Sequence, residues 1–181
     1  TPYSTTAMSA AEKFTAPSMH HIFGTDNFGR DIFSRVMQGL GTTLVISTSV
    51  VLFSAVAGVL LGAFTGYFGG ILDEILMRIT DAVNGFPSIL LTLVIISLLG
   101  KGRQNVIIAL GIVFIPSFVR IVRGEFLRLR DDDYIKRARL MGVGRLRILF
   151  VHILPNIFSI LLVSVMIGFN NAILAESGMS Y

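Results

Sequence analysis

The sequence contains no cysteine, and charged residues are scarce. Without cysteine the chain forms no disulfide, no thiolate metal site and no cysteine nucleophile. Asp, Glu, Lys and Arg make up 14% of the 181 residues, against about 25% in ordinary soluble domains. The apolar fraction is 53% and the mean hydropathy is +0.76. This composition excludes a disordered chain and indicates a protein embedded in a membrane.

Stretches without ionisable residues locate the expected membrane spans. The longest lies between Arg35 and Asp73 and contains the apolar run 42–64. A spanning helix needs about 20 such residues, so this run is expected to cross a membrane. Similar gaps predict three more spans, at 82–100, 104–122 and 153–175. The sequence therefore predicts an all-α, polytopic membrane helical bundle with about four spans in a domain of residues 42–181, preceded by a segment of residues 1–41.

Lys and Arg are distributed unevenly between the two sides that four spans define. Ten of the fifteen fall in the loop 67–80 and the segment 120–150, and five fall on the other side. Because cytoplasmic loops carry an excess of Lys and Arg, we expect residues 123–150 to be cytoplasmic and residues 1–41 to lie outside. An external N-terminus without a signal sequence predicts at least one further span before Thr1 in the parent protein.

The segment 123–150 is longer than a turn between two spans needs. Three consecutive aspartates, 131–133, predict the start of a short helix over 134–141, because acidic residues favour that end of a helix. Gly142 and Gly144 are expected to end this helix, and a second helix follows directly. Three roles remain open for the segment: docking of a cytoplasmic partner, a solvated connector, and a basic surface for anionic lipid. Nucleic acid is not expected as a partner, because aromatic side chains do not alternate with the charges.

Part of this segment resembles a known motif. Residues 138–142, ARLMG, followed after nine residues by HILP at 152–155, are similar to the EAA motif of ABC importer permeases. That motif reads Glu-Ala-Ala, three residues, Gly, nine residues, Ile-x-Leu-Pro. Lys136 and Arg137 stand where the motif has Glu and Ala. The matching positions are Ala138, Gly142, Leu154 and Pro155.

A second motif lies upstream. Residues 21–35, HIFGTDNFGRDIFSR, resemble the H-P-x-G-T-D-x-x-G-R-D-x-x-S-R signature of the dipeptide, oligopeptide and nickel permeases, with Ile22 where proline is usual. Three further segments that resemble this family follow in the same order, at 66–70, 86–88 and 175–180. The resemblance therefore covers residues 19–181.

The resemblance implies a type I ABC importer permease subunit in a bacterial or archaeal inner membrane. Such subunits have six spans, of which this chain would hold the second to the fifth. Its implied partners are a homologous second permease subunit, two cytoplasmic ATP-binding subunits, an external substrate-binding protein and the lipid bilayer. Short peptides are the implied cargo, with nickel or a metal chelate as the alternative. A non-transporting membrane scaffold is the remaining alternative.

The short helix would couple the permease to its ATPase. Ala138 and Gly142 are four residues apart and share a helix face, and small residues on that face would let another protein pack closely. The chain has no Gly-x-x-x-x-Gly-Lys-Ser/Thr loop, so we expect no enzyme activity and no bound cofactor, with ATP and Mg²⁺ on the partner subunits. The resemblance implies the coupling residues Lys136, Arg137, Ala138, Arg139, Gly142, Gly144, Arg145, Leu154 and Pro155.

A charged turn around Asp26 and Arg30 is expected outside the membrane. It could contact the binding protein, hold a metal ion through its oxygens, or be self-satisfied. In the last case Arg30 pairs with Asp26 or Asp31, and glycines supply special backbone angles. The binding-protein contact would comprise Gly24, Thr25, Asp26, Gly29, Arg30 and Asp31.

Polar residues near the end of the last span could line a substrate pathway. Polar and acidic side chains at membrane depth are costly and usually functional, which makes candidates of Asn170, Asn171 and Glu176. The glycines of 58–66 are expected to let helices pack closely. Pro87 and Pro116 are expected to bend helices.

Overall fold

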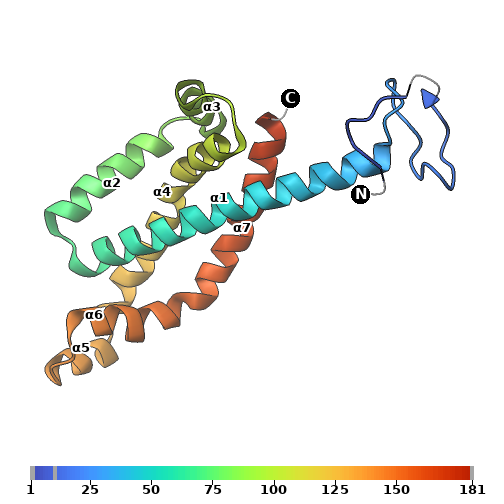
Figure 1. Ribbon diagram of the computed structural model, residues 1–181. Helices are drawn as coiled ribbons and strands as arrows, with labels where there is room; N and C mark the ends of the chain where they lie inside the picture. The colour runs from blue at the N-terminus through green and yellow to red at the C-terminus, as the bar shows by residue number, and fades with distance from the viewer. Residues whose placement is uncertain (1–2, 10–11, 180–181) are drawn as a thin grey trace. The chain divides into compact units, whose positions relative to one another are not determined.

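Helices make up nearly all of the regular structure in the computed structural model, which describes residues 3–9 and 12–179 (Figure 1). Within these residues the only strand-like pairing is an isolated antiparallel bridge between Thr25 and Asp31. The all-α class predicted from the sequence is confirmed. The chain divides into an N-terminal unit of residues 1–45 and a helical unit of residues 46–181.

Helix α1 (Ile32–Phe68) contains the first predicted span and extends beyond it at both ends. Its sequence holds no proline, so its backbone hydrogen bonds run without interruption. The helix ends at Gly69, whose φ of 66° lies in the left-handed region that favours glycine. Gly70, with φ 75°, then begins α2 (Gly70–Asn84) in a new direction.

The second predicted span is not a single helix. Helix α2 ends at Asn84, α3 (Ser88–Leu99) begins after Pro87, and the two helices are bent by 96° relative to each other. Proline lacks an N–H and pushes the preceding residue out of the helical region, so a break at this position is expected. The predicted segment 82–100 therefore joins the last turn of α2 to α3. The 12 residues of α3 rise only about 18 Å, less than a hydrocarbon core of about 30 Å.

Helix α4 (Arg103–Leu129) contains the third predicted span and continues past its expected end. Pro116 lies inside α4 without ending it. After α4 the chain forms α5 (Asp133–Leu140), α6 (Arg145–Arg147), the π-helix η2 (Ile148–Ile153), the 3₁₀-helix η3 (Leu154–Ile157) and α7 (Phe158–Met179).

Three helical runs are long and apolar enough to cross a membrane, namely α1, α4 and residues 145–179. The bent pair of α2 and α3 makes a fourth if it counts as one span. The last run begins before the predicted span 153–175, because π- and 3₁₀-turns join α6 to α7 without an interruption. Which of these runs cross the bilayer, and at which residues, stays a prediction.

Three glycines bring α1 directly against α4. Gly58, Gly62 and Gly66 repeat every four residues and so lie along one face of α1. A Cβ added at Gly58 would lie 2.3 Å from the Cβ of Phe118, and one at Gly62 would lie 2.7 Å from the Val119 carbonyl oxygen. The close packing expected from these glycines is confirmed.

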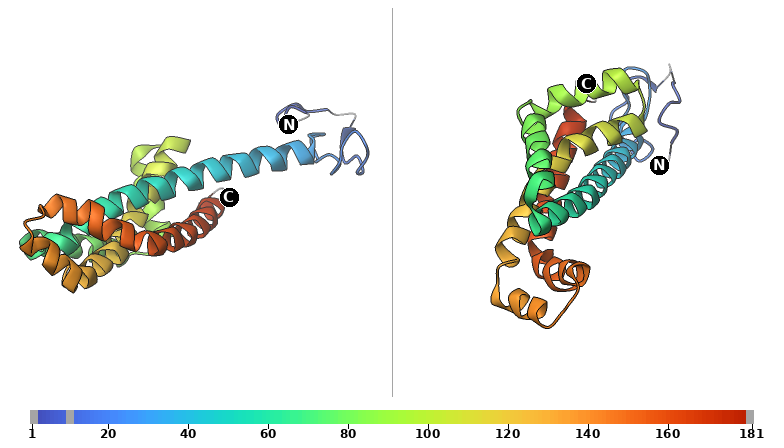
Figure 2. Two further views of the ribbon diagram at one scale, coloured as in Figure 1. Left: turned by 90° about the horizontal axis from the view of Figure 1, so that it is seen from below. Right: turned by 90° about the vertical axis from the view of Figure 1, so that its left-hand side faces the viewer.

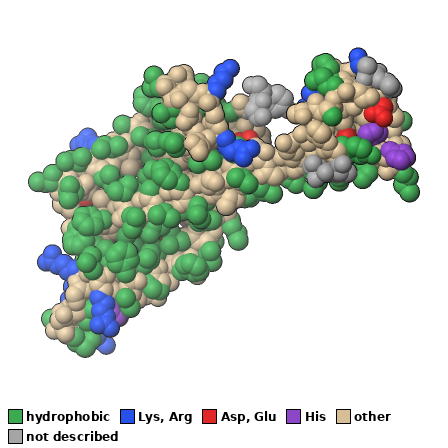
Figure 3. Space-filling view, in the orientation of Figure 1, with side chains coloured by type: hydrophobic (Ala, Val, Ile, Leu, Met, Phe, Trp, Pro, Cys, Tyr) green, Lys and Arg blue, Asp and Glu red, His purple; other side chains and the backbone are tan. Residues whose placement is uncertain are grey.

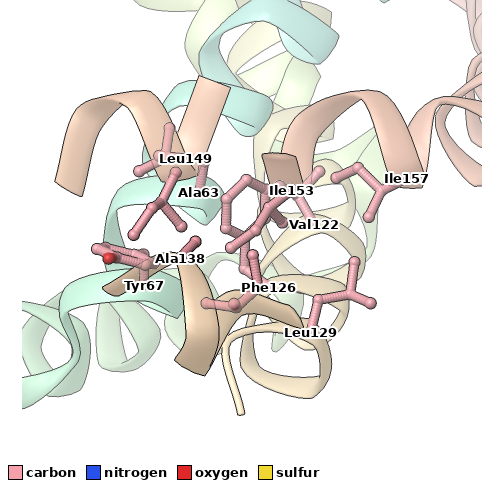
Figure 4. Packing of buried hydrophobic residues seen from close by; sticks show 11 residues of the cluster. Ala63, Tyr67, Val122, Phe126, Leu129, Ala138, Leu149, Ile153 and Ile157 are labelled. Atoms are coloured by element: carbon pink, nitrogen blue, oxygen red, sulfur yellow. The ribbon is translucent and has the colours of Figure 1, made fainter. Parts of the chain in front are cut away.

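Buried apolar side chains form two clusters in the helical unit. The first joins α1, α4, α5, η2 and η3, and Figure 4 shows it from close by. The second joins the earlier part of α1 to α4 and α7 through Ile46, Val50, Val51, Leu110, Phe118, Ala172 and Ala175. Because α1 and α4 contribute to both clusters, they form the centre of this unit.

Helix α2 is held to α4 by two ion pairs, and α3 turns back against α4 (Figure 2). The Arg123 guanidinium donates two hydrogen bonds to Asp73, at 2.5 and 2.7 Å. Arg120 donates to Asp81 at 2.8 Å. Of the two ion pairs, the one between Arg123 and Asp73 is the more buried.

Replacing Gly62 by leucine is expected to separate α1 from α4, because α4 backbone occupies the space that the new side chain needs. Overpacking costs about 1–3 kcal/mol, so the thermal midpoint of the purified full-length permease should fall. Gly124→Leu on α4 is the matched control, since an added Cβ there meets nothing within 4 Å. Equal losses in both variants would contradict the close contact.

Candidate functional site

The short helix α5 begins one residue earlier than the sequence predicted. Asp132 precedes it in an extended conformation, and its carbonyl oxygen accepts hydrogen bonds from the N–H groups of Ile135 and Lys136. The Asp132 side chain makes no capping hydrogen bond. Asp133 lies in the first turn, 3.7 Å from the Lys136 ammonium. The acidic residues therefore favour this end through their charge rather than through a side-chain cap.

The end of α5 is a left-handed turn at Gly142. Its φ is 78°, its N–H donates to the Arg139 carbonyl, and the N–H of Val143 donates to the Ala138 carbonyl. This pair of hydrogen bonds defines a Schellman motif, in which glycine is preferred because a side chain strains the left-handed backbone. The predicted turn at Gly142 is confirmed.

Gly144 has a different role from the one expected. Its φ of −62° and ψ of 147° are open to any residue, and a Cβ added there meets nothing within 4 Å. It precedes α6 instead of ending α5. Helix α5 ends at Leu140, one residue before the predicted end, and Gly142 alone completes the cap.

The inner face of α5 is buried in the first apolar cluster. Ile135 is 0% exposed and Ala138 is 4% exposed. Figure 4 shows Ala138 beside Tyr67 of α1, with Phe126 of α4 in the same cluster. The expected reason for a small residue at 138 was therefore wrong, because its side chain packs against this chain's own helices and not toward a partner.

The outer face of α5 presents apolar side chains that the sequence analysis did not single out. Leu140 is 89% exposed and Met141 is 77% exposed. Lys136 and Arg137 are also exposed. The sequence did contain a signal for this exposed surface, namely the adjacent apolar residues Leu140 and Met141 inside a strongly basic segment. In Figure 3, Lys and Arg side chains gather at this end of the helical unit, around α5 and α6.

Residues after α6 bind α5 back to the helices. The Asn156 amide donates to the Tyr134 hydroxyl at 3.0 Å and to the His152 carbonyl at 2.9 Å. Within η2, the wide π-turn lets Ile148 and Ile153 both reach the buried cluster although they are five residues apart. Neither the π-turn nor the Asn156 contact was anticipated from the sequence.

The two motif residues that follow η2, Leu154 and Pro155, contribute to packing and to the start of the next helical turn. Leu154 packs against the first apolar cluster. Pro155 lies in the first turn of η3, where its missing N–H removes no helical hydrogen bond. The coupling roles of Leu154 and Pro155 stay predictions, and so do the coupling roles of Arg139 and Arg145.

The three pathway candidates do not share a face of α7. Each helical residue advances about 100°, so Asn171 lies about 100° and Glu176 about 240° around the axis from Asn170. Asn171 lines a cavity of about 110 Å³ between α4 and α7, together with Ser117 and Ser164. Asn171 is therefore the one of the three candidates that the lining of this cavity supports.

In the N-terminal unit, Asp26 closes the predicted charged turn. Its carboxylate accepts hydrogen bonds from the N–H groups of Phe28 and Arg30 and from the guanidinium groups of Arg30 and Arg35. Burial alone would raise the pKa of Asp26, but these hydrogen bonds and the charge of Arg30 outweigh it and lower the pKa to about 2. The interpretation as a self-satisfied turn is confirmed.

Asp31 is a second, buried acid of the same turn. Its carboxylate binds the His21 ring nitrogen at 2.9 Å and accepts a hydrogen bond from the Ser34 N–H at 2.8 Å. Burial opposes ionisation, and these hydrogen bonds overcome it, so the pKa of Asp31 is lowered. Gly24 and Gly29 both have φ 72°, as the turn requires.

These contacts change which side chains of the turn are available. Thr25 and Asp31 are buried, and the Asp26 carboxylate is fully engaged. Among residues 3–9 and 12–179, no group of three or more His, Cys, Asp or Glu converges to hold a metal ion. The binding-protein contact assigned to this turn stays a prediction.

Comparison with known proteins identifies related sequences. Residues 58–181 match a family model described as the binding-protein-dependent transport system inner membrane component. A protein named as a peptide transport system permease of Brucella suis is 43% identical over 175 residues, 97% of this chain and 59% of the relative. The dipeptide transport system permease of Alkalihalophilus pseudofirmus is 39% identical over 94% of this chain and 56% of the relative. The oligopeptide transport system permease of Bacillus subtilis is 37% identical over 99% of this chain and 58% of the relative. The chain thus spans less than two thirds of the length of these curated relatives.

Acidification is expected to loosen the turn around Asp26. Folding lowers the pKa of Asp26 from 3.8 to about 2. The ionised carboxylate therefore stabilises the folded turn fully at a pH above its unfolded pKa, and this stabilisation is lost as the pH falls through the folded pKa. Hydrogen exchange of the Phe28 and Arg30 amides, corrected for intrinsic rates, should stay constant down to pH about 4 and rise below it. Asp26→Asn should raise exchange already at neutral pH. Unchanged protection in that variant would contradict the assignment.

Proposed function

Because the chain belongs to the family of binding-protein-dependent transport system inner membrane components, we propose that it forms part of the permease subunit of an ATP-driven peptide importer. The family consists of transport proteins of the membrane, and the apolar helices fit a multi-pass protein. The proposed subunit forms half of a translocation pathway, and a homologous second permease subunit supplies the other half.

The observation that carries this proposal is the two-sided character of α5. Its inner side chains, Ile135 and Ala138, are anchored among residues of α1 and α4. Its end exposes Leu140 and Met141, which nothing covers among the residues that the structure describes. A force applied to α5 would therefore reach two of the apolar helices directly, because packed interiors transmit displacement instead of absorbing it. This is the mechanical requirement for coupling an ATPase to membrane helices.

The proposed cycle is alternating access. Two cytoplasmic ATP-binding subunits bind ATP with Mg²⁺ and close, α5 moves with them, and the attached helices switch the pathway from one side of the membrane to the other. ATP hydrolysis then belongs to those subunits. In this scheme residues 123–150 are cytoplasmic, and residues 1–41 lie outside, where a substrate-binding protein delivers cargo.

Short peptides are the proposed cargo. The relatives described above are named for peptides, dipeptides and oligopeptides. The Asn171 amide, which lines the cavity between α4 and α7, offers hydrogen-bonding groups suited to polar cargo. Nickel or a metal chelate is the alternative that the upstream motif leaves open.

Coupling is tested by replacing the exposed end of α5. Leu140→Asn with Met141→Asn should abolish co-purification of the ATP-binding subunits and substrate uptake, while the permease still reaches the membrane. Met19→Asn is the matched control, because Met19 is also fully exposed and apolar but lies in the unit proposed to be external. Retained co-purification in the double variant would overturn the coupling role of α5 and favour a non-transporting scaffold.

Cargo is tested by uptake competition in a deletion strain that carries the full-length permease. Uptake of a labelled dipeptide should be inhibited by unlabelled dipeptide and, to a lesser degree, by a longer peptide. Chelated nickel should not compete. Competition by nickel alone would replace the peptide proposal with the metal alternative.

A further inference from the structure

Four arginines of the segment between α4 and η2 form no ion pair with any carboxylate of the described residues, 3–9 and 12–179. Of the ten Lys and Arg in residues 67–80 and 120–150, six lie within 4.0 Å of a carboxylate: Arg78, Arg120, Arg123, Arg128, Arg130 and Lys136. Within the described part of the chain, no carboxylate lies that close to Arg137, Arg139, Arg145 or Arg147. The positive charge that the chain leaves uncompensated on this side is therefore concentrated on α5 and α6.

Two of these arginines line a polar cavity. The cavity has a volume of about 470 Å³ and is lined by Tyr67, Phe68, Arg139, Val143 and Arg145. The Arg139 guanidinium lies 5.2 Å from the centre of the Tyr67 ring, which orients it. No acidic residue lines this cavity, so it is suited to an anion.

An apolar groove adjoins this cavity. Its volume is about 430 Å³, and it is lined by residues of α1, α2, α6 and η2 that are all apolar except Thr65. Phe64 of the groove and Phe68 of the cavity have ring centres 4.6 Å apart. Leu146 of the groove directly follows Arg145 of the cavity. The two spaces therefore meet along α1 and α6.

We propose that this pair of spaces binds one anionic phospholipid. The phosphate would lie in the cavity with Arg139 and Arg145, because guanidinium groups donate paired hydrogen bonds to phosphate oxygens. An acyl chain would lie in the groove, where it replaces exposed apolar side chains in contact with the bilayer. Basic segments next to membrane helices attract anionic lipids in the same way.

The groove favours a lipid over a protein partner. Acidic side chains of a protein could neutralise Arg139 and Arg145, but they would not fill an apolar space that extends to Leu72 and Leu76 of α2. Leu140 and Met141, the proposed ATPase contact, line neither space. Arg139 and Arg145 are also among the coupling residues that the family resemblance implies, so the test below distinguishes lipid binding from contact with the ATPase. The lipid site depends only on the chain being a membrane protein, not on its cargo.

The test uses the assembled transporter with its full-length permease subunit. The complex is equilibrated in detergent with equal amounts of phosphatidylglycerol and phosphatidylcholine, and native mass spectrometry measures the lipid that stays bound. Phosphatidylglycerol should be retained at least tenfold more than phosphatidylcholine. This comparison needs no variant, and equal retention of the two lipids would overturn the proposal.

Variants then locate the lipid. Arg139→Gln with Arg145→Gln should lower retention of phosphatidylglycerol about tenfold. Arg78→Gln with Arg128→Gln removes the same charge at residues paired with acids and should leave retention unchanged. Equal losses in both double variants would indicate general charge attraction and overturn the site. Loss of the ATP-binding subunits with lipid retained would reassign the two arginines to the protein partner.

The groove is tested from its other end. Leu72→Gln, which changes only the apolar wall, should also weaken retention. Glycerol phosphate has the head group without acyl chains and should fail to displace the lipid. Complete displacement by glycerol phosphate would show that the cavity binds free phosphate esters, which contradicts a lipid site.

Discussion

The helical unit depends on the contact between α1 and α4. Three glycines leave one stretch of α1 without side chains, so α4 lies directly against it. Neither helix gains a hydrophobic driving force from association inside lipid, because acyl chains are as apolar as leucine. Close packing must therefore provide the attraction, and it requires residues without a Cβ. The two apolar clusters each include residues of α1 and of α4.

The same contact explains how α5 can be both small and firmly attached. Eight residues form a marginal helix on their own. Here the helix is stabilised by burial of Ile135 and Ala138 against the paired helices and by the glycine cap at its end. Its exposed end is thereby held in one orientation. A partner bound there would act on the α1–α4 pair without an intervening flexible joint.

Particular residues show where sequence reasoning succeeded. The break at Pro87 and the turn at Gly142 follow from backbone chemistry that single residues impose, and the first, third and last apolar runs follow from length and hydropathy. The orientation of Ala138 could not be deduced, because helix spacing shows which residues share a face but not what covers it. The π-turn of η2 and the contact between Tyr134 and Asn156 depend on packing between segments that are distant in the chain.

The sequence by itself determined an all-α membrane chain, its apolar runs, its basic segment and its family motifs, because hydropathy, charge and turn residues act locally. Tertiary structure alone decided which arginines found acidic partners and which were left to line a cavity. Arg123 and Arg139 are equally basic in the sequence, yet Asp73 lies beside the first and an aromatic ring beside the second. Electrostatic partners are set by distance in space, and only the folded chain defines that distance.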